Sequence, residues 1–218
     1  MKNPRICAVV VSNDPGIIKE VSPLADLFEL RIDLIGEGWQ QLTRQLDKPW
    51  IACNRQPAEG GQWQGSEARR IETLLQAVEL GAHVIDIELN TANLENVARV
   101  IKKTTKLLLS YHDLEGTPSL DELKGIVRKQ IKAGADICKV VTTAREFEDN
   151  LTVLQLIREF PDVRVISFCM GPSGLISRVL CPLVGGKFTY AAMEKGKESA
   201  RGQMTISEMR RIYGMVTA

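Results

Sequence analysis

One lysine of this sequence lies in the middle of an apolar segment. In ADICKVV, residues 135–141, Lys139 stands between Cys138 and Val140 in what reads as a short buried strand. Lysine is rarely buried, because dehydrating an ammonium group is costly. Burial and neighbouring cations, here Arg31 and Arg55, lower the pKa of a lysine, and a neutral amine adds to a ketone or aldehyde to form a Schiff base. We therefore expect Lys139 to be a nucleophile with a lowered pKa.

A histidine at the end of another strand-like segment complements this lysine. A protonated imine makes the neighbouring C–H bond acidic, so the reaction needs a base whose pKa lies near the working pH. His112 ends the segment LLLSYH, whereas the second histidine, His83, lies at a helix-to-strand turn and is assigned no role. Lys139 and His112 together predict an imine-forming lyase or aldolase.

Charged residues alternate with apolar ones in two further segments. Glu29, Arg31 and Asp33 alternate in ELRID, and Asp86 and Glu88 alternate in IDIE. A period of two places such residues on one face of a strand. Unpaired, each buried charge would cost on the order of several kcal/mol, so we expect them to pair with one another and with a polar ligand. Each segment alone also fits a strand exposed on one face in another fold, or a simple salt bridge.

Eight strand-like segments recur along the chain and alternate with helical patterns. The segments cover residues 6–11, 27–34, 50–55, 84–89, 106–113, 137–142, 163–170 and 187–193. Capping boxes at Ser119–Glu122 and Thr205–Glu208 predict two helix starts, and a third helix is predicted between Ser66 and Gly81. The helical patterns that follow the first, second and seventh strands are weak.

Strict alternation of strand and helix predicts parallel strands with right-handed crossovers. GAHVIDI (81–87) and GADICKV (134–140) repeat the same helix-to-strand junction two units apart. We predict a single (β/α)8 TIM barrel of parallel strands over residues 1–218, with the charged side chains at its catalytic, carboxyl-terminal end. A doubly wound open sheet is the alternative, although no glycine-rich dinucleotide motif follows a strand.

The composition narrows the class of partner. Twenty-eight basic and 27 acidic residues give a net charge of +1, which argues against nucleic acid or an anionic membrane as partner. The sequence shows neither an apolar run of bilayer length nor a cleavable signal pattern, which predicts a cytoplasmic protein. The five cysteines contain no C-x-x-C pair and read as small buried residues, so no metal site is predicted.

Six motifs in order resemble the type I 3-dehydroquinate dehydratase family. They are ELRIDL (29–34), NRQPAEGG (54–61), SYHDLEGTP (110–118), ADICKVV (135–141), ISFCMGPSGLISRVL (166–180) and ESARGQMTIS (198–207). The resemblance implies a (β/α)8 barrel that removes water from 3-dehydroquinate without metal or organic cofactor, and it suggests a homodimer. Lys139 would form the imine with the C3 ketone, His112 would act as general acid and base, and Glu59 would orient His112.

The resemblance also implies a set of substrate-binding residues. Glu29, Arg31 and Arg55 would hold the ring hydroxyls. Arg178 and Gln203 would grip the carboxylate, with Ser199 in the closing loop. Met170 and Tyr190 would form apolar walls, Tyr190 standing where the family usually has phenylalanine.

The segment AMEKGKESARGQ, residues 192–203, is polar and contains two glycines, which predicts a mobile lid or, alternatively, an ordinary surface loop. Arg201 replaces a proline that is more frequent in the family and adds a cation near the carboxylate.

Two other functions are compatible with these residues. A class I Schiff-base aldolase would share the lysine and would need a phosphate-binding loop after the seventh or eighth strand, where GPSG (171–174) and VGGK (184–187) offer glycines. A non-catalytic barrel that binds an anionic metabolite is the third possibility.

Overall fold

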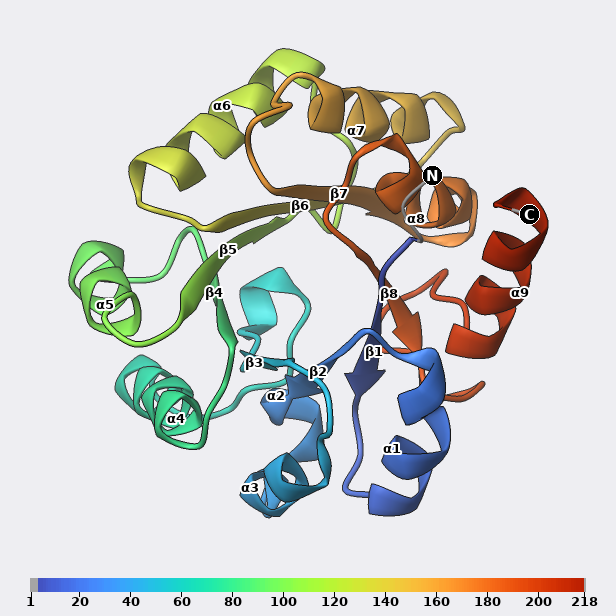
Figure 1. The fold of residues 1–218 in the computed structure, drawn as a ribbon. Helices are drawn as coiled ribbons and strands as arrows, with labels where there is room; N and C mark the ends of the chain where they lie inside the picture. Colours follow the sequence, from blue (N-terminus) through green and yellow to red (C-terminus); the bar gives the residue numbers. More distant parts are fainter. Residues whose placement is uncertain (1–3, 218) are drawn as a thin grey trace.

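Between residues 4 and 217, the chain forms eight strands enclosed by helices (Figure 1). The computed structural model describes residues 4–217, so residues 1–3 and 218 of the predicted domain lie outside the described part. The strands are β1 (Ile6–Val10), β2 (Leu27–Arg31), β3 (Trp50–Cys53), β4 (Val84–Glu88), β5 (Lys106–His112), β6 (Ile137–Thr143), β7 (Val165–Met170) and β8 (Thr189–Ala192). They match the eight predicted segments, most of them to within two residues at either end.

The strands pair in the cyclic order of a barrel. All ladders are parallel, β1 to β7 are neighbours in chain order, and β8 pairs with β1. Between β7 and the segment before β8, the Lys187 amide donates a hydrogen bond of 2.9 Å to the Val165 carbonyl. The predicted (β/α)8 barrel is confirmed, and the open-sheet alternative is wrong because β8 returns to the first strand.

Helices follow every strand, and the weakly predicted ones are short. The α-helices are α1 (Pro15–Val21), α2 (Ile32–Ile35), α3 (Trp39–Leu42), α4 (Glu67–Glu79), α5 (Leu94–Ile101), α6 (Leu120–Lys132), α7 (Glu148–Arg158), α8 (Leu175–Leu180) and α9 (Ile206–Val216). Short 3-10 turns are η1 (Ser22–Leu24), η2 (Thr43–Gln45), η3 (Pro57–Glu59), η4 (Pro172–Gly174) and η5 (Cys181–Val184). Both predicted capping boxes are present, at the starts of α6 and α9.

The repeated Gly-Ala junctions end two helices in the same way. Gly81 after α4 and Gly134 after α6 both have a φ of 89°, a left-handed conformation that a residue with a Cβ rarely adopts. In each case the following alanine amide donates back into the last helical turn, from Ala82 to Ala77 and from Ala135 to Gln130. These junctions turn the chain directly into β4 and β6, which carry Asp86 and Lys139.

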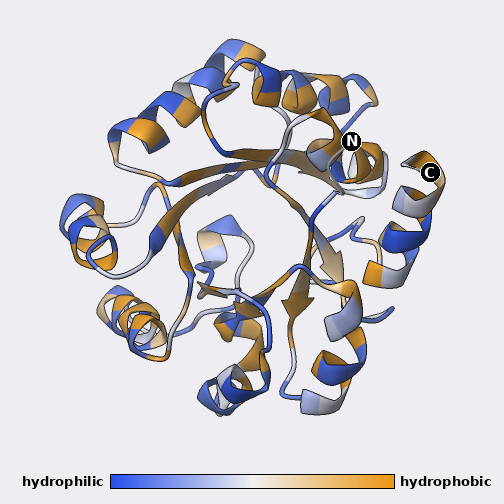
Figure 2. Ribbon diagram, viewed as in Figure 1, coloured by the Kyte–Doolittle hydropathy of each residue, from blue (hydrophilic) through white to orange (hydrophobic). Residues whose placement is uncertain are grey.

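Alternation along the strands separates the apolar core from the charged interior. Phe28 and Leu30 of β2 belong to a buried cluster with the surrounding helices, whereas Glu29 and Arg31 line the barrel cavity. The helices present apolar faces to the strands and polar faces outward (Figure 2). The charged residues of β2 therefore lie inside the barrel because their apolar neighbours are buried against helices.

Strand β2 ends well before the end of its predicted segment, residues 27–34. β2 ends at Arg31, whose partner Cys53 is also the last residue of β3, so no ladder continues beyond it. Asp33 therefore does not lie on the strand face with Glu29 and Arg31 but in the first turn of α2. Its carboxylate still accepts two hydrogen bonds from the Arg31 guanidinium, at 2.9 and 2.7 Å.

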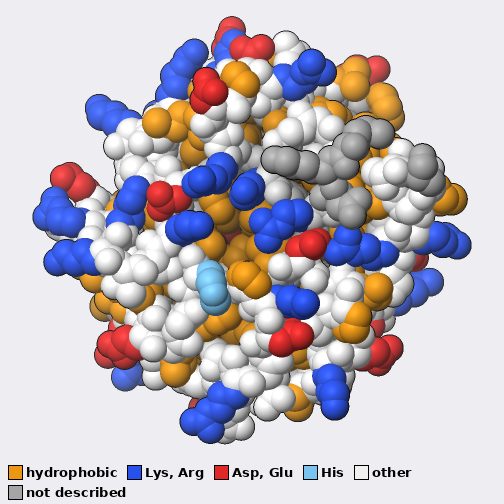
Figure 3. Space-filling model, viewed as in Figure 1, with side chains coloured by type: hydrophobic (Ala, Val, Ile, Leu, Met, Phe, Trp, Pro, Cys, Tyr) orange, Lys and Arg blue, Asp and Glu red, His pale blue; other side chains and the backbone are white. Residues whose placement is uncertain are grey.

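On the surface, acidic and basic side chains are interspersed around the rim of the face in Figure 3, as the near-zero net charge suggests. Among residues 4–217, none of the helices combines the length and the apolar character that crossing a bilayer requires.

The buried Gln130 of α6 provides a test of how the barrel is braced. Its side-chain amide donates to the carbonyls of Leu109 (3.0 Å) and Lys139 (2.9 Å), joining β5, β6 and the helix. Gln130→Met leaves two buried carbonyls without this donor, so we expect the free energy of unfolding to fall by about 1–3 kcal/mol in a urea titration. Gln155→Met, on the exposed face of α7, should change it by less than about 0.5 kcal/mol. Equal stability of both variants would contradict this role.

Candidate active site

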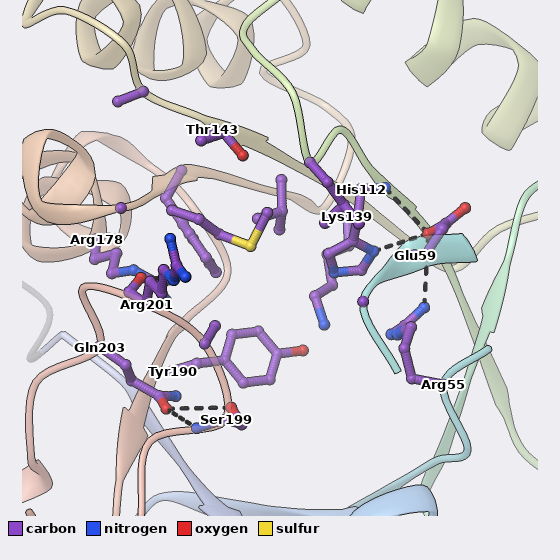
Figure 4. Close-up of a pocket in the computed structure, with 18 of the residues that line it drawn as sticks. Arg55, Glu59, His112, Lys139, Thr143, Arg178, Tyr190, Ser199, Arg201 and Gln203 are labelled. Atoms are coloured by element: carbon purple, nitrogen blue, oxygen red, sulfur yellow. Dashed lines mark hydrogen bonds and ion pairs between the residues drawn. The ribbon is translucent and has the colours of Figure 1, made fainter. Parts of the chain in front are cut away.

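A cavity of about 500 Å³ opens among the carboxyl-terminal ends of the strands. All eleven residues predicted for the site line it: Glu29, Arg31, Arg55, Glu59, His112, Lys139, Met170, Arg178, Tyr190, Ser199 and Gln203. Figure 4 shows Glu59, His112 and Arg55 on one side and Arg178 and Arg201 on the other. Side chains from five strands, from helix α8 and from the loops after β3 and β8 converge on one space.

Lys139 lies deep in this cavity, only 5% exposed. Its Nζ is 2.9 Å from Asp86 Oδ2 and 3.6 Å from Glu29 Oε1, and it stands 4.3 Å from the centre of the Tyr190 ring. Figure 4 shows the amine directed into the cavity beside His112. The predicted buried lysine is therefore present, with an anionic environment.

This environment reverses the expected direction of the lysine pKa. Burial acts to lower the pKa of Lys139, and Arg55 acts in the same direction, but the carboxylates of Asp86 and Glu29 more than offset them and the pKa is raised. Arg31, expected to be a second cation beside the lysine, is instead paired with Asp33 at 2.7 Å. The free amine is thus held as an ammonium, and the site favours positive charge on Nζ.

A chain of buried charges fixes Asp86. The carboxylate of Asp86 forms an ion pair with Arg55 Nη2 at 2.8 Å, and it accepts hydrogen bonds from the Ser110 hydroxyl (2.7 Å) and from Lys139. Burial alone would raise the pKa of Asp86, but Arg55, Lys139 and Ser110 hold it well below its usual range. Asp86 is therefore a permanent anion beneath the cavity. It holds Lys139, Arg55 and Ser110 in place and favours positive charge on the lysine.

This network of buried ion pairs extends outward through Glu88 to Arg70, an arginine that the sequence analysis did not single out. Glu88 contacts Arg55 Nη1 at 3.1 Å and Arg70 Nη1 at 2.6 Å, and all three side chains are buried. Arg70 comes from α4 and also donates to the Asn54 carbonyl. The helical pattern around Arg70 did not predict that this arginine is buried. An arginine on a helix is buried only where it meets a carboxylate of a neighbouring strand, and the helix period does not show which residue does so.

A tight loop after β3 brings Glu59 onto His112. The loop curls inward, so that η3 lies within the ring of strands in Figure 1. Gly61 allows this path, since a Cβ there would lie 1.9 Å from the Arg55 carbonyl oxygen. Glu59 Oε2 accepts from the His112 amide at 3.0 Å and lies 2.8 Å from the ring nitrogen Nδ1. The imidazole is therefore oriented with its other nitrogen, Nε2, available to the cavity.

The two groups titrate as a pair. Burial raises the pKa of Glu59 to about 8, Glu88 and Asp86 adding to the effect and Arg55 opposing it. Burial, Arg55 and Lys139 hold the pKa of His112 well below its usual value. Below about pH 8 the pair holds one more proton than above it, in the hydrogen bond between Oε2 and Nδ1, and Nε2 then carries a hydrogen. When that proton leaves, Nδ1–H donates to the carboxylate and Nε2 becomes an acceptor.

The opposite side of the cavity holds a cation that has no acidic partner within residues 4–217. Arg178 is 2% exposed, no carboxylate of these residues contacts it, and its Nε makes no hydrogen bond with them. It lies over the Phe168 ring at 4.6 Å and donates at 3.5 Å to the Arg201 carbonyl. Burial lowers its pKa to about 10. A buried guanidinium that lacks an anion is suited to bind the carboxylate of a ligand.

The loop after β8 closes this side. Ser199 and Gln203 bond to each other, the Gln203 Oε1 accepting from the Ser199 amide (2.8 Å) and hydroxyl (3.1 Å). The Arg201 carbonyl accepts from the Gly171 amide at 3.1 Å, which docks the loop onto the turn after β7. Arg201 itself lines the cavity, as expected for a cation near a carboxylate site. Opening of this loop as a lid stays a prediction.

The apolar wall is larger than predicted. Met170 and Tyr190 line the cavity, joined by Phe168 and Val141, and Phe168 packs edge-on against Tyr190 with ring centroids 6.0 Å apart. Thr143 completes this wall and is labelled in Figure 4. Phe168 stands two residues before the predicted Met170 on β7, and Val141 and Thr143 follow the predicted Lys139 at alternate positions of β6, so strand alternation would have found all three.

Three of the described residues have metal-ligand atoms close together. One ligand atom each of Glu29, Cys53 and Asp86 lie within 4.8 Å of one another. Burial raises the pKa of the Cys53 thiol, and both carboxylates already contact Lys139. A divalent cation would have to displace that ammonium, so this set fits a metal poorly.

His83 and the segment VGGK lie at the opposite end of the barrel from the cavity, before the strands β4 and β8. His83 precedes β4, at the helix-to-strand turn predicted for it, and its Nδ1 accepts from the Trp50 amide at 3.4 Å. VGGK (184–187) precedes β8, so the expectation that it follows a strand at the catalytic end is wrong. GPSG (171–174) does follow β7, and Gly171 lines the cavity.

Comparisons of the sequence and of the fold with known proteins agree on one family. The sequence model described as type I 3-dehydroquinase matches residues 6–218. A protein of Dehalococcoides mccartyi strain 195 named 3-dehydroquinate dehydratase is 43% identical over 216 residues, covering 99% of this chain and 97% of that protein. The protein of the same name from Methanococcus maripaludis strain C5 is 36% identical, covering 97% and 99%. The crystal structure of 3-dehydroquinate dehydratase from Geobacillus kaustophilus has a TM-score of 0.84 at 27% identity, covering 99% and 92%.

The coupled titration of Glu59 and His112 can be observed directly. In ¹⁵N NMR of the free protein, we expect His112 Nε2 to change from protonated to unprotonated at about pH 8. In Glu59→Gln the ring should titrate at its own lowered pKa, so the transition moves to acidic pH. His83→Gln assigns the signal, because His112 is then the remaining histidine. An identical transition in Glu59→Gln would show that the two groups are not coupled.

Docking of the loop after β8 depends on Gly202. A Cβ at Gly202 would lie 2.3 Å from the Gly171 carbonyl oxygen, and its φ is 76°. Gly202→Ala should therefore release the loop and raise hydrogen exchange at the Gly171 amide by at least about tenfold. Gly196→Ala is the matched control, since Gly196 has a φ of 84° with nothing within 4 Å. Equal exchange in both variants would mean that backbone strain, not the collision, governs the loop.

Proposed function

Because the chain belongs to the type I 3-dehydroquinase family, we propose that it is the hydro-lyase that converts 3-dehydroquinate to 3-dehydroshikimate in the shikimate pathway. We further propose that Lys139 forms a Schiff base with the substrate and that His112 is the general acid and base. The observation that carries the mechanism is a buried lysine amine set between two carboxylates, beside a histidine and a glutamate whose Nδ1 and Oε2 atoms lie 2.8 Å apart.

The raised lysine pKa is compatible with an imine intermediate. An ammonium must lose a proton before it can add to the C3 ketone, and the Glu59–His112 pair is the neighbouring group whose pKa range allows it to take that proton. Loss of water from the adduct leaves a protonated imine, which carries its positive charge on the same nitrogen. Asp86 and Glu29 then stabilise the iminium as they stabilise the ammonium. The site thus stabilises the protonated imine, which is the form of the intermediate that withdraws electrons from C2.

Elimination follows from the same geometry. With the imine at C3, His112 Nε2 takes the proton from C2, and the electron pair of that bond forms an enamine. The enamine expels the C1 hydroxyl, which leaves as water with the proton from His112. Hydrolysis of the resulting conjugated imine returns the Lys139 amine and releases the product. Glu59 keeps the imidazole aligned through its contact with Nδ1 at 2.8 Å.

The unpaired Arg178 accounts for the carboxylate on C1. Its guanidinium contacts no carboxylate in the described part of the chain, and Gln203 and Arg201 line the same side of the cavity. A carboxylate bound there is held across the cavity from His112 (Figure 4). Glu29, Arg31 and Arg55 line the remaining wall, where the ring hydroxyls would bind.

The alternatives have less support. Membership of the family favours a dehydratase over an aldolase, and of the two glycine motifs offered for phosphate only GPSG is at the catalytic end. A non-catalytic barrel would have no need for a dissociable Glu59–His112 pair. The homodimer, the independence from metal and cofactor, and the cytoplasmic location remain predictions from the sequence.

Trapping the imine tests both activity and mechanism. With 3-dehydroquinate and borohydride, we expect a substrate-derived mass on the peptide that contains Lys139, and without borohydride the ultraviolet absorbance of the conjugated enone product, unchanged by a chelator. Lys139→Ala should lose the adduct and more than about 10⁴-fold in kcat. Lys132→Ala, on the exposed face of α6, should retain both.

Other outcomes separate the alternatives. Turnover of phosphorylated sugars with 3-dehydroquinate left untouched would indicate an aldolase. Thermal stabilisation by 3-dehydroquinate with no enone absorbance would indicate a binding protein. Enone formation without any adduct on Lys139 would remove the Schiff base from the mechanism.

A further inference from the structure

The phenol hydroxyl of Tyr190 has no hydrogen-bond partner among the described residues. The residue is 4% exposed, and its side chain lies in the wall of the cavity. In Figure 4 the hydroxyl is directed across the cavity toward the end of the Lys139 side chain. A buried hydroxyl without a partner is costly, and buried tyrosines usually satisfy theirs. Tyr213 does so, donating to the Val179 carbonyl at 2.9 Å.

The contacts that the Tyr190 ring makes within the protein do not involve its hydroxyl. It packs against Phe188 and Phe168, with centroids 5.4 and 6.0 Å apart, and supports the Lys139 ammonium at 4.3 Å. A phenylalanine would make all three contacts. The hydroxyl therefore adds nothing to the packing of the protein, and its cost points to a ligand that completes it.

A matching acceptor is also left unpaired. Glu29 Oε1 is buried and makes no hydrogen bond, although it lies 3.6 Å from Lys139 Nζ. Burial raises the pKa of Tyr190 well above its ordinary value, with Glu29 adding to the effect, so the phenol stays protonated and can donate. One donor and one acceptor thus flank the nitrogen that would carry the substrate. A ligand hydroxyl, which both donates and accepts, satisfies the two together.

We propose that the Tyr190 hydroxyl is a specificity-determining donor to the hydroxyl on C4 of the substrate, which in turn donates to Glu29 Oε1. C4 is the ring carbon next to C3 on the side away from the reacting C2, so its hydroxyl lies close to the imine nitrogen. The inference rests on the proposed function and deepens it: the sequence predicted Tyr190 as an apolar wall, and the structure assigns a polar contact to it.

The test compares Tyr190→Phe with the unaltered protein on two substrates, 3-dehydroquinate and its 4-deoxy analogue. With 3-dehydroquinate, we expect kcat/KM to fall about 3- to 10-fold, the range for one neutral hydrogen bond. With the 4-deoxy analogue, the two proteins should differ by less than about twofold, because the acceptor is absent. The melting temperature of Tyr190→Phe should be unchanged or higher, since no bond within the protein is lost.

Tyr213→Phe is the matched control, because it removes a buried hydroxyl that does have a protein partner. It should lower the melting temperature and leave kcat/KM unchanged. Equal kcat/KM of Tyr190→Phe and the unaltered protein on 3-dehydroquinate would overturn the inference, and so would an equal loss on both substrates. Failure of the unaltered protein to dehydrate 3-dehydroquinate would instead overturn the proposed function.

Discussion

The ion pair between Lys139 and Asp86 organises the barrel interior. An ammonium and a carboxylate 2.9 Å apart, both buried, are stable there only because further charges compensate them. Arg55 and Glu88 extend the pair across β3 and β4, and Arg70 of α4 ends the chain at the barrel wall. Removing one member would leave an uncompensated charge on its neighbour, so the network holds the reactive lysine in place by the same interactions that stabilise the fold.

The cavity divides into a saturated half and an unsatisfied half. Around Asp86 and Glu88, nearly every charge has a partner. Elsewhere in the cavity, Arg178 contacts no carboxylate of residues 4–217, and within the same range the Tyr190 hydroxyl and Glu29 Oε1 make no hydrogen bond. The saturated half positions the reacting groups, whereas the unsatisfied half is complementary to a ligand with a carboxylate and hydroxyls. Binding such a ligand regains the interactions that folding left unmade.

Strand alternation explains how much of the site could be read from the sequence. A charge between apolar residues, as at Glu29, Arg31, Asp86 and Lys139, has a meaning that depends only on the period of a strand, and all four line the barrel or contact a residue that does. Asp33 was misplaced because the strand ends where its neighbour's ladder ends, which is a property of the pair. Arg70 escaped notice because a helix period does not reveal which residue meets a buried carboxylate.

The sequence by itself determined the eight parallel strands, their alternation with helices, and the charged residues of the strands that meet in the barrel, since periodicity and capping are local properties of the chain. The remaining cavity residues were predicted only from the resemblance of six motifs to a known family: Glu59, Met170, Arg178, Tyr190, Ser199 and Gln203. Only the tertiary structure decided the charge on Lys139. Burial and cations would have lowered its pKa, but Asp86 and Glu29, from strands distant along the chain, lie close enough to raise it. Electrostatic energy depends on distances across the barrel, and those distances exist only after the ring of strands has formed.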